Sequence, residues 1–402
     1  MAMIDVEAVD PRARGLRTPR AEDAAALGDR LRRLDWVLMA ALAALLAYCL
    51  WAIDGITATN PAGSQMSRQI TYAVGGFVLF LAALVIDPDV YRRHKQALYV
   101  GTLALMGFVL MAGTVVRGSR RWIDLGFFQL QPSEFGKVLF TLFLAGFLAD
   151  RGRRVTEFST ILAAVGLALV PILLVERQPD LGTALTYAAS LAAVLFVAGA
   201  RWLHLAILGV AGALAATFVL WGGPQLGVDI LKPYQRDRLI GFVDPTSDPA
   251  GTTYNITQSI TAVGAGGVDG RGVAGATQTS LNYLPEHDTD FVFASLAEQR
   301  GFVGAAILLL LYLLVVWRGL RIMASARDAF CAIAAGGLVF MFIFQIFVNV
   351  GMTIGIAPIT GIPLPFLSVG GSSMVTNLLA MGILQAIHLR SVRPRRPRRV
   401  RR

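Results

Sequence analysis

Long apolar stretches dominate the chain, and each is about as long as a helix that crosses a lipid bilayer. None shows the every-second-residue alternation of a barrel strand. They lie at 36–53, 70–87, 97–115, 133–149, 160–176, 181–199, 203–222, 291–317, 329–351 and 372–389. A hydrocarbon core about 30 Å thick needs roughly 20 apolar residues per helix. The pattern therefore predicts an all-α polytopic membrane protein with about ten transmembrane helices.

The polar segments between these stretches predict the domain organisation. Residues 1–34 form an N-terminal tail, 35–390 the ten-helix membrane domain, and 391–402 a basic C-terminal tail. The connector 223–290 far exceeds the roughly 15 residues above which structureless loops are uncommon. Within it, Ile256, Ile260 and Val263 recur at near-helical spacing. We therefore expect this long external loop to be partly ordered.

Basic residues indicate the orientation in the membrane. Most of the 36 Lys and Arg residues lie in both tails and in alternate connectors, near Arg92, Arg151, Arg201 and Arg318. Cytoplasmic connectors of membrane proteins carry this excess of positive charge. Both termini are therefore predicted to be cytoplasmic, and the connector 223–290 external.

Composition narrows the function classes. Hydrophobic residues make up 55% of the chain and charged residues 15%, which excludes an ordinary soluble domain. The net charge of +10 and the basic tail are explained by topology and by anionic lipid, and no nucleic-acid motif is present, so we predict no nucleic-acid partner. Cys49 and Cys331 lie inside apolar stretches, and the four histidines are scattered, so no protein metal site is predicted.

Acidic residues stand where inward-running helices are expected to begin. Glu134 follows Pro132, Asp180 follows Pro179, and Asp290 ends an acidic run that precedes another apolar stretch. Helix N-termini expose free N–H groups and a positive dipole end, which attract anions such as a diphosphate. The alternative is structural: Glu134 could pair with Lys137 at i, i+3, and Asp180 could cap its helix.

Several basic side chains lie on the predicted outer side, against the orientation rule. They are Arg117, Arg120, Arg121, Lys137 and, in the long connector, Arg238. Short loops tolerate such exceptions when the overall bias already sets topology. A guanidinium, however, matches phosphate oxygens in geometry and charge. The pattern favours a phosphate site over an exception to the rule.

The motifs at these helix starts resemble those of the SEDS family (shape, elongation, division and sporulation). The matching stretches are Arg120–Gly126, Gln131–Lys137, Gln178–Thr183, Lys232–Leu239, Leu284–Phe291 and Pro358–Ser373. The similarity covers about residues 36–390. Residues 349–355 and 361–363 look more like the elongation branch, typified by RodA, than the division branch, typified by FtsW. One departure is Asp288, which stands where the family usually has a histidine; His287 stands one place earlier.

The resemblance implies a peptidoglycan glycosyltransferase of the bacterial cytoplasmic membrane. Such an enzyme polymerises lipid II, carried on undecaprenyl diphosphate, at the outer face of the membrane. It would act with a class B penicillin-binding protein, a transpeptidase, and with the elongation machinery. The family's essential aspartate corresponds to Asp290, and its polar cavity residues correspond to Glu134, Lys137 and Asp180.

These assignments give a mechanistic hypothesis. Asp290 is the base for the acceptor hydroxyl, and the leaving diphosphate is stabilised by positive charge, with or without a divalent cation (Mg²⁺ or Mn²⁺). The other candidate substrate-binding residues are Glu134, Lys137, Asp180, Arg117, Arg121, Arg238, Glu286, Asp288, Ser372 and Ser373. Three alternatives stay open: a lipid II flippase, a division-specific FtsW-like polymerase, and a scaffold that activates a partner synthase.

Overall fold

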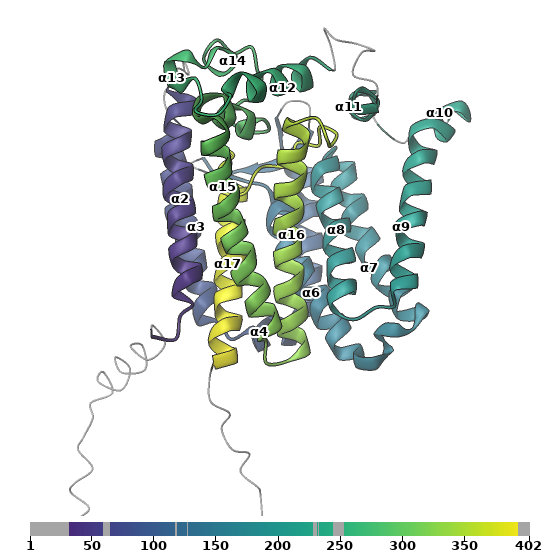
Figure 1. The fold of residues 1–402 in the computed structure, drawn as a ribbon. Coiled ribbons are helices and arrows are strands. Elements are labelled where there is room, and N and C mark those ends of the chain that lie inside the picture. The colour runs from purple at the N-terminus through teal and green to yellow at the C-terminus, as the bar shows by residue number, and fades with distance from the viewer. Residues whose placement is uncertain are drawn as a thin grey trace, which may run out of the picture.

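The computed structural model is a bundle of long, roughly parallel helices (Figure 1). It describes residues 32–58, 65–116, 119–126, 128–227, 231, 233–243 and 253–392. One end of the bundle, here called the loop face, carries α11 (Pro233–Val243), α12 (Tyr254–Gly266), α13 (Gly272–Gly275) and α14 (Thr277–Ser280). The opposite end, the tail face, holds both ends of the described chain. Residues 1–31 of the predicted tail 1–34 and residues 393–402 of the predicted tail 391–402 lie outside the described residues.

Each predicted apolar stretch coincides with a helix. These helices are α2 (Trp36–Thr57), α3 (Met66–Val85), α5 (Lys95–Ala112), α6 (Pro132–Arg151), α7 (Phe158–Arg177), α8 (Leu181–Val197), α9 (Trp202–Thr217), α15 (Val292–Ala324), α16 (Ala329–Thr353) and α17 (Gly371–Val392). Within the described residues, nine are long and apolar enough to cross a membrane, while α8 has only 17 residues. The predicted all-α polytopic fold is confirmed.

Short elements occupy the ends of the long helices. Pro88–Arg93 forms α4, Gly152–Thr156 forms η2, Phe218–Gly222 forms η3, and Gly223–Gln225 forms α10. A small antiparallel sheet follows α5 at the loop face, in the order β1 (Thr114–Val116), β2 (Ser119–Asp124) and β3 (Gln129–Leu130). This sheet was not predicted, and α5 ends at Ala112, three residues before the predicted end of its apolar stretch. The sheet carries Arg120 and Arg121 at the loop face.

The predicted external loop is anchored inside the start of α15. This helix is broken at Gly301, whose φ of 65° lies in the left-handed region that glycine tolerates best. The break frees N–H groups for the loop: Phe302 N donates to Gly267 O at 2.9 Å, and Val303 N donates to Val268 O at 3.1 Å. The helix α12 packs on α15 just before this point. The connector 223–290 is therefore partly ordered, as predicted.

A buried carboxylate secures the same anchor. Glu298 is fully buried in α15, and its oxygens accept Gln278 N at 2.8 Å, Thr279 N at 2.9 Å and Thr279 Oγ1 at 2.7 Å. These are the first residues of α14, whose free N–H groups need acceptors. Since a charged group is buried only when it is well bonded, Glu298 is a structural residue of the loop face.

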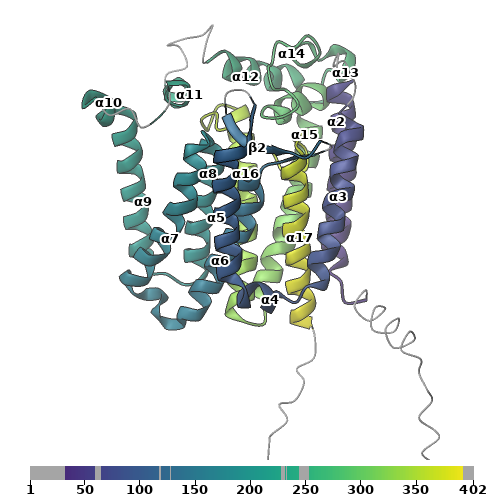
Figure 2. The ribbon, with the colours of Figure 1, turned by 180° about the vertical axis from the view of Figure 1, so that it is seen from behind.

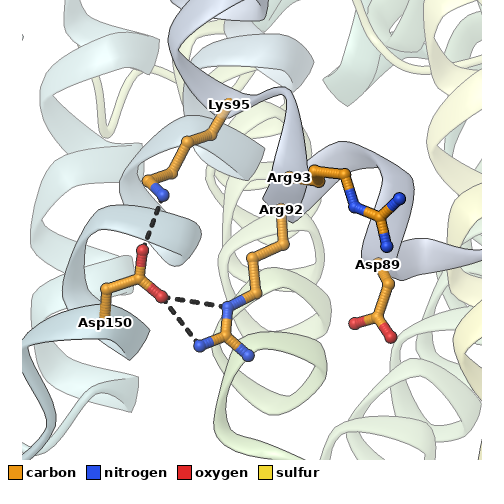
Figure 3. A pocket seen from close by; sticks show the side chains of 5 residues that line it. All are labelled: Asp89, Arg92, Arg93, Lys95 and Asp150. Carbon is orange, nitrogen blue, oxygen red and sulfur yellow. Dashed lines mark hydrogen bonds and ion pairs between the residues drawn. The ribbon is translucent and has the colours of Figure 1, made fainter.

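Ion pairs connect neighbouring helices at the tail face. Arg92 Nη2 and Lys95 Nζ bind the two oxygens of Asp150 at 2.7 and 2.6 Å, in an open pocket that Asp89 and Arg93 also line (Figure 3). The hydrogen bonds to Asp150 raise the pKa of Arg92. These contacts tie α4 and the start of α5 to the end of α6. They are solvent-exposed at the rim, so each contributes little to stability.

The interior of the bundle consists of α6, α16 and α17. Most residues of these helices are buried, whereas α9 stands at the edge and packs mainly through its ends (Figure 2). The helices α6, α8, α15 and α17 all begin at the loop face. Their N-termini therefore converge there, as the sequence predicted from topology.

Candidate active site

A buried non-helical segment organises the loop face. Residues 354–370, between α16 and α17, are mostly buried although they form no helix. Their carbonyl groups are bonded by side chains from three helices: Asn349 Nδ2 to Ile362 O at 2.8 Å, Gln69 Nε2 to Ser368 O at 3.1 Å, and Tyr312 Oη to Pro365 O at 2.5 Å. Irregular backbone within a membrane bundle requires such partners. This segment is therefore built into the fold.

The 354–370 segment fixes the loop that carries Asp290. Asn349 Nδ2 donates a second bond to Asp290 O at 3.0 Å, and Ser368 Oγ donates to Thr289 O at 2.6 Å. Val369 N donates to Asp288 O at 2.9 Å. Three successive carbonyls of the acidic loop are thus held, which sets the position of the Asp290 carboxyl.

The carboxylate of Asp290 and the guanidinium of Arg238 meet at Gly361. A methyl group on Gly361 would lie 3.5 Å from Asp290 Oδ2 and 3.9 Å from Arg238 Nη1. Gly361 has a φ of 73°, so the bare backbone here both turns and leaves room for these two groups. Asp290 and Arg238 come from distant parts of the chain and are each partly exposed. The structure brings the predicted base and one predicted phosphate ligand together.

Two residues beside this point adopt uncommon backbone conformations. Glu286 has a φ of 54° and Phe366 a φ of 67°, both in the left-handed region. Glu286 accepts Thr289 Oγ1 at 2.9 Å, which holds the acidic loop in this shape. Such conformations cost about 1–3 kcal/mol and often mark functional sites. Asp288, next to Asp290 in the same loop, is also partly exposed.

Asp180 forms a second polar cluster at the start of α8. Its Oδ2 accepts Gln131 Nε2 at 2.7 Å and faces Arg121 Nη1 at 3.4 Å, and its Oδ1 caps α8 through Thr183 N at 3.1 Å. The structural reading of Asp180 as a helix cap is confirmed. The cap also orients an arginine that the sequence predicted to bind phosphate.

Helix α8 abuts the 354–370 segment through a glycine. A Cβ on Gly182 would lie 2.5 Å from Thr360 O, so only glycine permits this approach. Thr360 precedes Gly361. The Asp180 cluster and the Asp290 loop therefore lie against adjacent residues of one segment.

Lys137 and Glu134 form a buried ion pair in the first turns of α6. Lys137 Nζ lies 2.7 Å from Glu134 Oε2 and 3.0 Å from Gln345 Oε1, and the two residues are only 1% and 3% exposed. The i, i+3 pairing considered from the sequence is thus present. Since two of the three ammonium donors are already used, Lys137 has limited capacity for a direct phosphate contact.

The remaining predicted residues fall into two groups. Arg117 lies outside the described residues. Ser372 Oγ accepts Gln131 N at 2.8 Å and donates to Gln129 O at 2.8 Å, which joins α17 to β3, and Ser373 Oγ accepts Asn377 Nδ2 at 3.2 Å. Both hydroxyl groups are buried. Their predicted substrate contacts stay a prediction, and their visible role is to support the loop face.

Three buried amides shape this site, and the sequence reasoning assigned them no such role. Gln69, Gln345 and Asn349 are fully buried. Gln345 and Asn349 lie within the apolar stretch 329–351, and Gln69 precedes the stretch 70–87. Polar residues inside membrane helices are rare and tend to be functional. That signal was available in the sequence, but their partners were not.

No protein metal centre is evident in the part of the chain that the structure describes. Among those residues, no group of three or more His, Cys, Asp or Glu side chains could hold an ion. A Mg²⁺ or Mn²⁺ ion beside Asp290 would need most of its ligand oxygens from a bound substrate. The predicted divalent cation stays a prediction.

Comparison with known proteins places this geometry in a family. Residues 29–392 match the model of the cell cycle protein family that groups FtsW, RodA and SpoVE. The chain belongs to this family. The peptidoglycan glycosyltransferase MrdB of Escherichia coli K12 is 39% identical over 360 residues, which cover 88% of this chain and 93% of that protein. The probable peptidoglycan glycosyltransferase FtsW of Halorhodospira halophila is 36% identical over 364 residues, covering 88% and 89%.

A solved structure agrees with the fold. One chain of the structure described as "Structural coordination of polymerization and crosslinking by a peptidoglycan synthase complex" superimposes with a TM-score of 0.77 at 30% identity, covering 90% of this chain and 99% of that one. The family predicted from the motifs is confirmed, and so is the predicted enzyme class, peptidoglycan glycosyltransferase.

Proposed function

We propose that this FtsW–RodA–SpoVE family member polymerises lipid II at the outer face of the cytoplasmic membrane, with Asp290 as its catalytic base. The observation that carries the proposal is the convergence of Asp290 Oδ2 and Arg238 Nη1 on Gly361. A glycosyl transfer from a diphosphate needs a proton acceptor for the attacking hydroxyl and a cationic group for the leaving diphosphate. This pair supplies both.

The proposed step is a direct displacement. An acceptor sugar hydroxyl attacks the anomeric carbon of the donor, a new C–O bond forms, and the bond from that carbon to the diphosphate oxygen breaks. The hydroxyl proton passes to the Asp290 carboxylate, and undecaprenyl diphosphate leaves with the electron pair. One displacement inverts the anomeric configuration, so an α-linked donor gives a β-linkage.

Positive charge for the leaving group comes from Arg238 and Arg121. Arg238 adjoins Asp290, and Arg121 is held beside the site by Asp180. A planar guanidinium can contact two phosphate oxygens at once. Arg117 belongs to the same basic connector as Arg121 and is proposed to assist. Lys137 is already bound to Glu134, and we propose that its positive charge acts on the diphosphate without direct contact.

The distribution of charge supports an external active site. The tail face carries Arg92, Lys95, Arg318 and Arg390, and both basic tails begin there. By the positive-inside rule this face is cytoplasmic, so the loop face and Asp290 lie outside. This location suits the proposed reaction, because polymerisation uses lipid II whose sugars lie at the outer face of the membrane.

We further propose a class B penicillin-binding protein as partner, and a role in elongation. The similarity to a chain of a peptidoglycan synthase complex supports an assembly of polymerase and cross-linking enzyme. The elongation role rests on the motifs at 349–355 and 361–363. A division role is the alternative, because FtsW relatives match at comparable identity.

The test is polymerisation of fluorescent lipid II by the purified chain, with and without a class B partner. We expect long glycan strands from the native protein and none from Asp290→Asn, a variant of the same size that cannot act as a carboxylate base. Asp269→Asn is the matched control, since Asp269 is an exposed carboxylate of the same long connector. It should polymerise normally.

The same preparations separate the alternatives. In one outcome, the native protein and its cognate partner move labelled lipid II across the vesicle membrane but form no strands. That result would contradict the proposal and support the flippase alternative. If the Asp290→Asn variant and the partner together still form strands at the normal rate, the result would instead support the alternative in which this chain is a scaffold that activates the partner synthase.

A further inference from the structure

An apolar groove lies on the lipid side of the bundle, away from the candidate active site. It runs between α2 and α15 and encloses about 460 Å³. Small side chains of α2 form one wall and leucines of α15 the other; the lining residues are Trp36, Val37, Ala40, Ala41, Ala44, Leu311 and Leu314. Trp36 and Val37 are 58% and 45% exposed, so the groove opens at the tail-face end of α2.

Basic and aromatic side chains continue the groove at that end. On α15, Leu311, Leu314, Arg318 and Arg321 follow at helical spacings of three and four residues, so they share one side of the helix. Arg318 confirms the direction, because it binds Asp35, the residue that caps α2. The guanidinium groups of Arg318 and Arg321 lie 5.2 and 5.1 Å from the ring centre of Trp317.

The two arginines differ in how their charge is used. Arg318 is neutralised by Asp35, which is 3% exposed. Arg321 is exposed, and its side chain forms no ion pair with any described residue; its guanidinium lies over the ring of Trp317. Trp36 and Trp317 mark headgroup depth, where tryptophan is enriched in membrane proteins. Among the described residues, therefore, no carboxylate neutralises Arg321, which lies at headgroup depth near the tail-face end of the apolar groove.

We propose that this groove binds an anionic phospholipid of the inner leaflet, with one acyl chain along Ala40, Ala44 and Leu311 and its phosphate on Arg321. The leaflet rests on the proposed orientation of the tail face. Basic pockets on the cytoplasmic side of membrane bundles recognise anionic headgroups. The small side chains of Ala40, Ala41 and Ala44 leave a recess along α2 that a flexible acyl chain can fill.

Charge decides between lipid and a partner helix as the occupant. Alanines at i and i+4, such as Ala40 and Ala44, also permit close helix packing. A transmembrane helix of a partner would, however, carry its own basic residues at the cytoplasmic end. These would face Arg321 and repel it. An anionic headgroup is attracted by the same charge.

The test uses the full-length chain in vesicles of phosphatidylcholine with a small fraction of phosphatidylglycerol that carries a photoreactive acyl chain. Cross-linked peptides are mapped by mass spectrometry. We expect labelling within 36–44 and 311–321, competed by unlabelled phosphatidylglycerol and not by phosphatidylcholine. Labelling spread evenly over all lipid-facing helices, or competed equally by both lipids, would overturn the proposal.

Two variants address the two halves of the site. Arg321→Gln removes the cation and Ala40→Leu fills the groove; we expect each to reduce the specific labelling at least fivefold. The matched controls are Arg327→Gln, an exposed arginine of the same face, and Ala206→Leu, an exposed alanine four residues after Trp202 in α9, as Ala40 follows Trp36. Both controls should label normally.

Thermal unfolding of each variant shows whether it is folded, so loss of labelling can be assigned to the site. Unchanged labelling in folded Arg321→Gln or Ala40→Leu would contradict the proposal. So would a disulfide between two copies of the variant Ala44→Cys, since it would identify a second copy as the occupant.

Discussion

Helices α9 and α17 invert the relation between hydrophobicity and burial that soluble proteins show. The most apolar 18-residue stretch of Trp202–Gln225, which contains α9, has a mean hydropathy of 2.2, yet only 6% of that stretch is buried. The corresponding stretch of Gly371–Val392 has a mean hydropathy of 1.3, and 89% of it is buried. Lipid accepts apolar side chains, whereas polar ones need partners from other helices. Polarity, not hydrophobicity, marks the interior of this bundle.

In the described part of the chain, the buried helices also contribute the polar side chains of the candidate site, whereas the lipid-exposed helix α9 does not. Helix α6, most of whose residues are buried, carries Glu134 and Lys137. Helix α16 carries Gln345 and Asn349, which bind Lys137 and the Asp290 loop. Helix α9 contributes no polar contact to the candidate site among the described residues. Substitutions should therefore matter on α6 and α16 and be tolerated on α9.

The largest effect is expected from breaking the buried ion pair. Lys137→Met leaves the Glu134 carboxylate buried without its cation, which should destabilise the fold by about 3–5 kcal/mol. Unfolding in mixed detergent measures it. The double variant Glu134→Gln, Lys137→Met should recover most of the loss, and Leu214→Met on α9 should change nothing. A single variant as stable as the native protein would show that the pair is not a structural element.

The next effect is on rate. Asn349→Leu has a similar volume but cannot hold the carbonyls of Asp290 and Ile362, so the carboxylate of Asp290 should shift. A displacement of about 1 Å can cost on the order of a hundredfold in rate. Lipid II turnover should show a fall in kcat with KM nearly constant.

The control for Asn349→Leu is Gln385→Leu. Gln385 is a fully buried amide of α17 whose side chain forms no hydrogen bond with a described residue. Its removal should leave the rate unchanged. Equal rate losses in the two variants would mean that burial of an amide, and not the position of Asp290, is what matters.

A smaller effect is expected at two helix glycines. In Gly136→Ala the new methyl would collide with Thr102, Met106 and Tyr187, whereas Gly209 on α9 has nothing within 4 Å. Overpacking of this kind costs about 1–3 kcal/mol. Gly209→Ala should be neutral or slightly stabilising, because alanine favours helix. Melting temperatures of the two variants compare them directly; equal values would contradict the packing around α6.

The smallest effect is expected at the tail face. Arg92 and Asp150 form an ion pair as short as that of Lys137 and Glu134, but their side chains are 40% and 39% exposed. Water and salt screen such pairs, so Arg92→Gln should cost at most about 1 kcal/mol. The difference from native protein should shrink further in 1 M salt, as unfolding curves at two salt concentrations would show.

The fold was largely predictable because the bilayer leaves few choices. Each apolar stretch became a helix, and the connectors that join α3 to α5, α6 to α7, α8 to α9 and α15 to α16 lie at the tail face (Figure 1). The β1–β3 sheet was missed because its short strands read as an ordinary connector. The break of α15 at Gly301 was also missed, since a lone glycine in an apolar stretch gives no sign of the loop that binds there.

The candidate site was predictable residue by residue but not in its arrangement. Charge at helix starts singled out Glu134, Asp180 and Asp290. That Glu134 pairs with Lys137, while Asp290 lies with Arg238 beside Gly361, depends on how the neighbouring helices and loops pack. No spacing in the sequence contains that information.

The sequence by itself determined the class of molecule, its ten helices and the end at which polar groups gather, because hydrocarbon thickness and the cost of bare backbone in lipid act on each segment alone. Tertiary structure alone decided that residues 354–370 fold inward and that Gln69, Tyr312 and Asn349 satisfy their carbonyls. It also decided that Asp290 and Arg238 meet at a bare glycine. Hydrogen bonds between distant segments are cooperative, so they exist only once all the helices that supply them have packed.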